Sequence, residues 1–306
     1  MLDPVELFPE VPNIYAFPSV HADMVFDKSR VAAYRDAINE TVKPGDVVAD
    51  LGSGTGLLSF LCLQAGAARV HAIERSDVIE WSKELADKNG FSDRMEFHKK
   101  DARDESLELG EKVDVIVSEL MGHVAFEEGM AETICVAKER FLKPGGATIP
   151  QTVTLRAALV HADELYRNYI DSWNVVEGID YSAMREKAVQ SAYVVDIHAD
   201  QILSDSQIIS VEAFLSNPRD TYDTFSFTSW RTGSINGLAF WFDADLTDRI
   251  RLSSGPRTYT HWQQCFIPFE KHIKVSAKHN IQVLIEMKYR KSFDQKFEFK
   301  ISKIDA

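Results

Sequence analysis

The chain has 306 residues, of which 45% are hydrophobic and 26% are charged, and its formal net charge is −13 at pH 7. This length allows two domains with separate cores, and the composition is ordinary for a globular protein. No apolar run approaches the length of a membrane span and no basic–apolar leader opens the chain, so we expect a cytoplasmic protein without a membrane partner. The acidic surface disfavours direct nucleic-acid binding and suits a cationic partner, although solubility alone explains it equally well.

The three cysteines are Cys62, Cys135 and Cys265, and no two of them form a CxxC pair. An odd number of thiols cannot pair completely, and the spacing matches no zinc motif. The cysteine pattern therefore predicts neither a disulfide framework nor a metal site.

The first half of the chain alternates short apolar runs with amphipathic segments. Buried strands that alternate with helices predict a parallel, doubly wound sheet, which we assign to residues 1–150. The expected strands lie in 45–56, 69–76, 94–102 and 112–120, and the expected helices in 57–67, 77–90 and 129–146, the last ended by Pro144 and two glycines.

After Pro150 the sequence becomes rich in strand patterns with a period of two. These patterns predict a second domain over 151–306, an antiparallel barrel or sandwich. Its expected strands lie in 151–160, 222–230, 237–246, 273–289 and 296–304. Residues 163–203 look helical and amphipathic, which fits either an ordinary connecting helix pair or an arm that contacts another subunit.

A glycine loop follows the first strand in the pattern "DLGSGTG", which contains Asp50, Gly52, Gly54 and Gly56. The spacing is D-x-G-x-G-x-G, not the G-x-G-x-x-G of dinucleotide enzymes, and no Gly-Lys-Ser/Thr loop is present for ATP. Glycines let the backbone approach a ligand where a side chain would collide.

Two further strand ends support a nucleotide-like ligand. Glu74 ends the second strand and can accept hydrogen bonds from ribose hydroxyls, while Asp101 and Ala102 end the third, where an adenine would lie. Purely structural glycines with a surface glutamate are the alternative. The combination at three consecutive strand ends predicts S-adenosylmethionine as the cofactor.

The loop "SELMGHVAFEEGM" places Glu119 and Glu128 in one turn after the fourth strand. Two carboxylates in one apolar loop repel each other, and one takes up a proton unless a cation lies between them. A guanidinium is planar, always charged and able to bind carboxylates through two hydrogen bonds. The pair therefore predicts a guanidinium site, against the alternative of two solvated loop residues.

This loop resembles the double-E loop of the protein arginine methyltransferases. Three other stretches are similar to that family: 15–38 to its N-terminal helical segment, 259–266 ("YTHWQQCF") to its Thr-His-Trp loop, and 173–189 to its dimerisation arm. The resemblance implies a class I S-adenosylmethionine-dependent methyltransferase, with a Rossmann-like domain, a β-barrel domain and a homodimer built through the arm.

The resemblance also implies roles for single residues. Glu119 and Glu128 match the two guanidinium-binding glutamates, whereas Glu127 is out of register. Arg30 matches the arginine that pairs with the cofactor's carboxylate, and His21 matches a histidine that contacts the cofactor.

The remaining matches lie on both sides of the acceptor pocket. Asp27 and His261 match an Asp–His pair that either accepts the released proton or fastens the N-terminal helix to the β-domain. Trp262 belongs to the substrate-facing loop, and Met24 and Met121 match methionines that shape the pocket. Without the resemblance, a core methionine and a core histidine would be the safer interpretations of Met24 and His261.

Several residues depart from the family pattern. Val11 replaces the first tyrosine of a Tyr-Phe-x-x-Tyr element, of which only Tyr15 remains. Leu120 and His123 replace a frequent tryptophan and tyrosine of the double-E loop. Arg103 stands where many members have an adenine-binding glutamate, which leaves Asp101 and the Ala102 backbone for the adenine.

The resemblance also implies the methyl acceptor. We expect an arginine in a protein or peptide, and free arginine or another small guanidino compound is the alternative. A non-catalytic dimeric binding partner with the same fold is a third possibility, although the intact glutamates and glycine loop argue against it.

Overall fold

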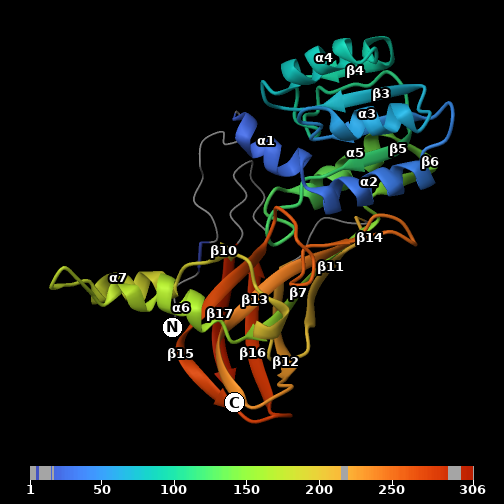
Figure 1. The fold of residues 1–306 in the computed structure, drawn as a ribbon. Coiled ribbons are helices and arrows are strands. Elements are labelled where there is room, and N and C mark those ends of the chain that lie inside the picture. The colour runs from blue at the N-terminus through green and yellow to red at the C-terminus, as the bar shows by residue number, and fades with distance from the viewer. Residues whose placement is uncertain (1–4, 7–14, 16, 215–219, 289–297, 306) are drawn as a thin grey trace.

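The computed structural model describes residues 5–6, 15, 17–214, 220–288 and 298–305. A parallel-sheet domain and an antiparallel β-domain lie one above the other, with helices α1 and α2 beside the parallel sheet (Figure 1). The fold class predicted from the sequence is confirmed. Within the described ranges, no helix is long and apolar enough to span a membrane.

The parallel sheet has five strands in the order β4-β3-β2-β5-β6. Its central strands are buried apolar segments, so helices must cover both faces. Because β2 lies at the centre, the loops after β2, β3 and β5 all open at one edge of the sheet. The strands are β2 (Val47–Leu51), β3 (Arg69–Ile73), β4 (Met95–His98), β5 (Val113–Ser118) and β6 (Leu142–Ile149), and the helices are α3 (Leu57–Gln64), α4 (Ile79–Lys88), η2 (Ser92–Arg94) and α5 (Met130–Phe141).

The expected helix over 129–146 is wrong at its C-terminal end. Helix α5 stops at Phe141, and 142–149 form strand β6 instead of continuing the helix to 146. Pro144 lies within this strand, which is possible because β6 is at the sheet edge and its pairing with β5 shifts register between Val113 and Val115.

The N-terminal segment forms α1 (Pro18–Val25) and α2 (Lys28–Thr41). Helix α2 begins at Asp27, whose carboxylate caps it by accepting from the Arg30 backbone N–H. The fully buried Tyr34 donates its hydroxyl to the carbonyl of Ser118, the last residue of β5. This contact ties α2 to the strand end from which the double-E loop leaves the sheet.

The β-domain contains two antiparallel sheets, with orders β10-β15-β13-β7-β11 (β14 pairing with β13) and β1-β17-β16-β12. Phe227, Phe240, Phe242 and Phe266 are among its buried side chains. The strands are β1 (Val5–Glu6), β7 (Thr152–Val160), β10 (Tyr193–Val195), β11 (Gln207–Glu212), β12 (Thr221–Thr228), β13 (Gly233–Asp245), β14 (Arg251–Ser253), β15 (Gln264–Val275), β16 (Asn280–Lys288) and β17 (Glu298–Asp305).

The expected strand 273–289 is two strands. Its first residues end β15 and its last form β16, with a turn at Lys278, whose φ is +63°. The expected strand runs through the mainly polar stretch 276–280, where no glycine or proline marks the turn. The sequence also missed β10, β11 and β14.

The segment 163–203 is only partly helical. It contains α6 (Asp163–Tyr169), η3 (Asp171–Trp173), a small hairpin of β8 (Val175–Val176) and β9 (Ile179–Asp180), α7 (Ser182–Val189) and η4 (Ala199–Gln201), besides β10. Helix α7 and the hairpin project away from the β-domain (Figure 1). Val175, Ile179 and Met184 are exposed there, so this part of the segment offers apolar side chains to solvent.

Candidate active site

The glycine loop after β2 turns sharply into α3. Gly52, Gly54 and Gly56 all have positive φ, at +72°, +52° and +90°. A Cβ at Gly52 would lie 2.4 Å from Leu120 Cδ2, and one at Gly56 would lie 2.3 Å from Ser82 Oγ. Both the backbone conformation and the close approach therefore require glycine at these positions.

The glycine loop carries buried polar atoms without partners. Asp50 Oδ2 accepts from Ser59 Oγ at 2.6 Å, but Asp50 Oδ1 and the hydroxyl of Ser53 have no hydrogen bond. Burial raises the pKa of Asp50 to about 7, against the lowering effect of the Ser59 hydrogen bonds. Buried polar atoms are normally paired. The two atoms fit a polar ligand that lies on this loop.

Glu74 lies beside the same loop. Its carboxylate accepts from the Gly54 N–H at 3.1 Å and from the Ser76 N–H at 2.7 Å, so it is held at the end of β3. Each carboxylate oxygen can accept a second hydrogen bond, which leaves capacity for ribose hydroxyls.

Arg103 clamps Asp101 at the end of the next strand. Both carboxylate oxygens of Asp101 accept from the Arg103 guanidinium at 2.9 Å, and Arg103 also pairs with Glu132 at 3.3 Å. Burial raises the pKa of Asp101, but the hydrogen bonds from Arg103 outweigh it and the net shift is downward. Ala102 next to it is buried. The Asp101 carboxylate thus remains ionised and engaged, and its role toward an adenine stays a prediction.

Helix α1 lies over the glycine loop. His21 is buried, its ring is within 3.6 Å of the point where a Gly54 Cβ would be, and it packs edge-on against Trp81. His21 Nε2 lies 2.8 Å from the Tyr15 carbonyl oxygen. This places His21 where the sequence expects a cofactor contact; Val11 lies outside the described residues.

Glu119 already holds a guanidinium. Its side chain is 5% exposed, and Oε2 accepts from Nε of Arg30 at 2.6 Å and lies 2.6 Å from Arg30 Nη2 in an ion pair. Its other oxygen accepts from the Met121 N–H at 3.2 Å. Arg30 Nη1 donates to the carbonyl of Met24, which is half-buried on α1. Arg30, which the sequence predicts at the cofactor's carboxylate, therefore contacts Glu119, which the sequence predicts to bind the acceptor, in this structure.

Glu128 lies at the more exposed end of the pair, where Tyr15 donates its hydroxyl to Glu128 Oε1 at 2.6 Å. Protein atoms displace water from the carboxyl group, and this desolvation raises the pKa of Glu128 to about 7. The negative charges of Glu119 and Glu127 also raise this pKa, and the Tyr15 hydrogen bond lowers it. A carboxyl group with such a pKa is stabilised in its ionised form by an incoming cation.

Glu127 turns back into its own loop. Its carboxylate accepts from the Val124 N–H at 3.0 Å, and it lies so close to Gly122 that a Cβ there would be 2.1 Å from Glu127 Cδ. Glu127 thus shapes the loop, while its neighbour Glu128 interacts with Tyr15.

The double-E loop and the Thr-His-Trp loop interlock across the two domains. The indole N–H of buried Trp262 donates to the Met121 carbonyl, and His123 Nδ1 lies 2.7 Å from the Trp262 carbonyl oxygen. Trp262 also packs edge-on against Phe242 of the β-domain. His123, which departs from the family pattern, therefore helps to fix Trp262 and Met121.

Asp27 joins α2 to the same β-domain loop. Oδ2 accepts from the His261 backbone N–H and lies within 2.9 Å of His261 Nδ1, while Oδ1 caps α2. Burial raises the pKa of Asp27, but the hydrogen bonds from His261 and Arg30 outweigh it and leave the pKa below its ordinary value. The Asp27 carboxylate thus accepts from three donors, which are the backbone N–H groups of His261 and Arg30 and the His261 ring.

These contacts bring most expected site residues to one edge of the parallel sheet. Two contacts were not expected from the sequence, the Tyr15 hydroxyl on Glu128 and the Arg30 guanidinium on Glu119. No sequence signal reveals them, because both join segments about 90 or more positions apart.

Comparison with known proteins shows the family to which the chain belongs. Residues 151–303 match the family model of the arginine methyltransferase oligomerization subdomain, and residues 42–201 match a methyltransferase domain model. Probable protein arginine N-methyltransferase 6 of Arabidopsis thaliana is 32% identical over 317 residues, covering 88% of this chain and 72% of the relative. Protein arginine N-methyltransferase 6 of Danio rerio is 32% identical over 286 residues, covering 85% and 79%.

Solved structures show the same fold. A chain of the Trypanosoma brucei PRMT1 enzyme–prozyme heterotetrameric complex with AdoHcy superposes with a TM-score of 0.84 at 23% identity, covering 90% of each chain. Protein arginine methyltransferase 10 of Arabidopsis thaliana gives 0.79 at 24% identity, covering 94% of this chain and 93% of the other. The chain belongs to the protein arginine N-methyltransferase family and is an S-adenosylmethionine-dependent methyltransferase.

Proposed function

We propose that this enzyme methylates a guanidinium nitrogen of arginine in proteins, with Glu119 and Glu128 as the residues that hold the acceptor. The observation that carries this proposal is the Arg30–Glu119 contact, in which a guanidinium donates one hydrogen bond to a nearly buried carboxylate oxygen and forms an ion pair with it. Glu128, whose pKa is raised to about 7, supplies the second carboxylate of the same loop.

The two carboxylates activate the acceptor by orienting it. A guanidinium is a poor nucleophile, because its lone pairs are delocalised and its pKa exceeds about 12. Glu119 and Glu128 draw positive charge toward the nitrogens they bind, so that the remaining nitrogen keeps more lone-pair character. Fixed orientation of this kind supplies roughly 7–11 kcal/mol in favourable model systems.

The cofactor lies, in this proposal, on the glycine loop under α1. S-adenosylmethionine supplies the electrophilic methyl group when it is bound. Glu74 binds the ribose hydroxyls, and Asp50 Oδ1 and Ser53 Oγ, which have no partner, offer further polar contacts. Arg30 would bind the amino-acid carboxylate of the cofactor, which would weaken its contact with Glu119 and leave that carboxylate for the substrate.

Arg30→Ala and Glu74→Ala are each expected to weaken cofactor binding by roughly tenfold or more. Each change removes hydrogen bonds to or from a charged group, which are worth about 1.5–3 kcal/mol. The dissociation constant of the cofactor is measured by calorimetry without an acceptor, so that changes in acceptor binding at Glu119 do not affect the measured value.

Arg35→Ala and Glu80→Ala are the matched controls, because Arg35 lies exposed on α2 and Glu80 exposed on α4. Both should keep the wild-type affinity. Unchanged affinity in Arg30→Ala and Glu74→Ala would place the cofactor elsewhere.

The acceptor class is tested by offering three kinds of guanidinium in parallel. Histone tails, Gly-Arg-rich peptides and free arginine are incubated with the enzyme, and methyl transfer is followed by mass spectrometry. We expect transfer to the peptides. Transfer to free arginine alone would assign the enzyme to small guanidino compounds, and no transfer with intact cofactor binding would favour a non-catalytic partner.

A homodimer is expected to form through the arm-like part of 163–203. The chain matches the oligomerization subdomain over 151–303, and the β8–β9 hairpin exposes Val175 at 66% and Ile179 at 60%. Sedimentation should show twice the chain mass of 34.6 kDa at micromolar concentration. A Val175→Asp/Ile179→Asp double variant should sediment as a monomer, since charges in an apolar interface cost more than they do in water.

Tyr222→Asp is the control for the dimer, because Tyr222 is 69% exposed on β12, outside the arm. A wild-type monomer would refute the homodimer, and a dimer that only Tyr222→Asp disrupts would place the interface on the β-domain sheet. A cytoplasmic location also stays a prediction, supported by three cysteines that form no disulfide, two of them buried.

A further inference from the structure

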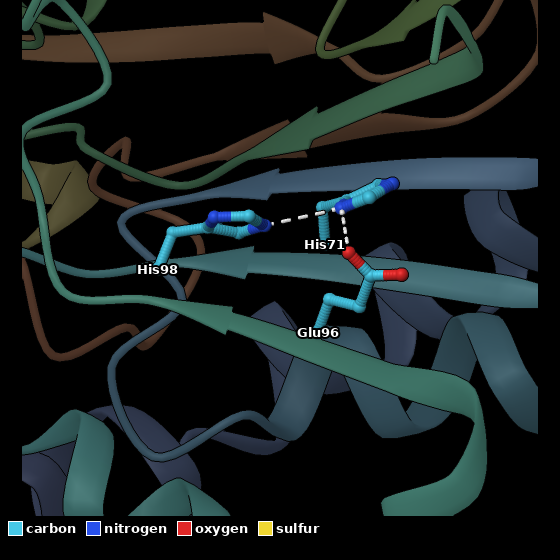
Figure 2. Close-up of side chains that lie close together, drawn as sticks. All are labelled: His71, Glu96 and His98. Carbon is cyan, nitrogen blue, oxygen red and sulfur yellow. Dashed lines mark hydrogen bonds and ion pairs between the residues drawn. The ribbon is translucent and has the colours of Figure 1, made fainter. Parts of the chain in front are cut away.

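Two histidines and a glutamate converge on one face of the parallel sheet, on β3 and β4 (Figure 2). His71 of β3 and Glu96 of β4 are register partners, so their side chains leave the sheet on the same face. His98 is two residues after Glu96 on β4 and therefore shares that face. The methyl-transfer site described above uses none of these side chains.

Two of the three separations between the ligand atoms fit a small transition-metal ion. His71 Nδ1 lies 3.1 Å from His98 Nε2 and 3.5 Å from Glu96 Oε2, and one ligand atom from each residue lies within 4.8 Å of the others. Tetrahedral zinc with bonds of about 2.0–2.1 Å has ligand atoms about 3.3–3.4 Å apart. Two imidazole nitrogens and one carboxylate oxygen are a set that zinc prefers.

Outer contacts orient the cluster. Arg69 binds Glu96 Oε1 at 3.3 Å and Glu111 Oε1 at 2.7 Å, which leaves Glu96 Oε2 toward His71. On the other side of the His71 ring, Nε2 lies 3.5 Å from Glu111 Oε1. A hydrogen on Nε2 that faces Glu111 leaves the Nδ1 lone pair toward His98 and Glu96, the arrangement of a metal-bound histidine held by an outer carboxylate.

An ordinary polar cluster explains this geometry less completely. The His71 side chain is fully buried, and its Nε2 makes no hydrogen bond of normal geometry. The two rings direct nitrogens at each other at 3.1 Å, which allows one N–H···N hydrogen bond, and a metal ion bound by both nitrogens would replace that bond. Glu96 is 46% exposed, so an ion can reach the cluster from solvent.

We propose that His71, Glu96 and His98 bind a Zn²⁺ ion, with water as the fourth ligand on the exposed side of Glu96. The ion would link the edge strand β4 to β3. The backbone carbonyl of His98 also accepts from the Glu74 N–H at 3.1 Å, so the linked strand ends support the proposed ribose-binding acid. This site was not predicted from the sequence, because its ligands are not cysteines and come from two strands.

The test measures metal binding to the full chain after chelator treatment. Zn²⁺ titration by calorimetry should show one tight equivalent, and Co²⁺ should give the strong visible absorption of a four-coordinate ion. His98→Gln and Glu96→Gln should each weaken binding by at least about tenfold, and Glu111→Gln by about tenfold through the loss of its hold on His71. Zn²⁺ should raise the melting temperature of the wild type but not of Glu96→Gln.

His161→Gln is the matched control, because His161 also lies beside a carboxylate, 3.4 Å from Asp163, but belongs to the β-domain. It should keep the tight equivalent. Wild-type binding in both His98→Gln and Glu96→Gln, or loss of the tight equivalent in His161→Gln, would overturn the site, as would the absence of a tight equivalent in the wild type. Glu96 lies at the exposed edge, so Glu96→Gln keeps the test decisive if His98→Gln fails to fold.

Discussion

Glu128→Gln is expected to lower the maximal rate of methyl transfer by roughly ten- to a hundredfold while the fold and the cofactor affinity stay intact. The substitution keeps the volume but turns an acceptor-only carboxylate into an amide whose NH₂ faces guanidinium donors. A charged hydrogen bond is worth about 1.5–3 kcal/mol. Because the contact strengthens as charge is drawn from the reacting nitrogen, the loss should appear in kcat and not only in KM.

Glu119→Gln should behave similarly, and the double variant should lose less than the sum of the two single losses. Both carboxylates hold one cation, so neither contributes fully without the other. Glu119→Gln also weakens the contact with Arg30, which is the reason to measure its rate at saturating cofactor.

Glu127→Gln is the control within the same loop. Its side chain accepts from the Val124 N–H, and the amide oxygen of glutamine can do the same. Because this contact is kept, we expect Glu127→Gln to stay close to wild-type activity. An inactive Glu127→Gln beside a fully active Glu128→Gln would shift the loop register by one residue. Full activity in all three variants would remove the paired carboxylates from the mechanism.

The same pair predicts a pH dependence. Glu128 is largely protonated below its pKa of about 7 and ionised above it. Only the ionised form attracts the guanidinium, so kcat/KM for the acceptor should rise with pH through about 7 and then level off. Asp50 has a similar pKa, so the cofactor is kept saturating. The rise should be smaller in Glu128→Gln.

Much of the fold could be predicted because short stretches of the sequence indicate it. The apolar runs of β2, β3 and β5 indicate buried strands, and the glycines of the first loop indicate close approach of a ligand to the backbone. Strand β6 was missed, since Pro144 and two glycines look like a helix end and only the sheet edge makes them compatible with pairing. The turn at Lys278 was missed because its positive φ is imposed by the hairpin and not by the residue type.

The site was predictable where one segment contains it and unpredictable where segments meet. Asp50, the glycines and the glutamate pair lie in short motifs. By contrast, the interlock of Trp262 with Met121 and His123 joins residues about 140 positions apart. The position of Arg30 on Glu119 depends on how α2 packs against the end of β5, which no local pattern encodes.

Asp27→Ala is expected to destabilise the folded enzyme by about 2.5–4 kcal/mol, because it removes a helix cap worth about 1 kcal/mol and a charged hydrogen bond worth about 1.5–3 kcal/mol. The side chain is 3% exposed, so water cannot replace the lost contacts. The lowered pKa of Asp27 means that this stabilisation is fully present at neutral pH and is lost only as the pH falls below about 3.8 toward the folded-state value. Thermal unfolding should show a shift of several degrees.

His261→Gln separates a fastening role from proton transfer. It removes the ring contact but keeps the backbone N–H on Asp27, so a fastening pair predicts a smaller loss of stability, about 1 kcal/mol. At saturating cofactor and acceptor, well below the melting temperature, kcat should then stay within a few-fold of the wild type. We expect this result, because three donors already use the Asp27 carboxylate. A hundredfold loss of kcat with unchanged thermal stability would instead make His261 the proton acceptor, with Asp27 as the residue that orients its ring.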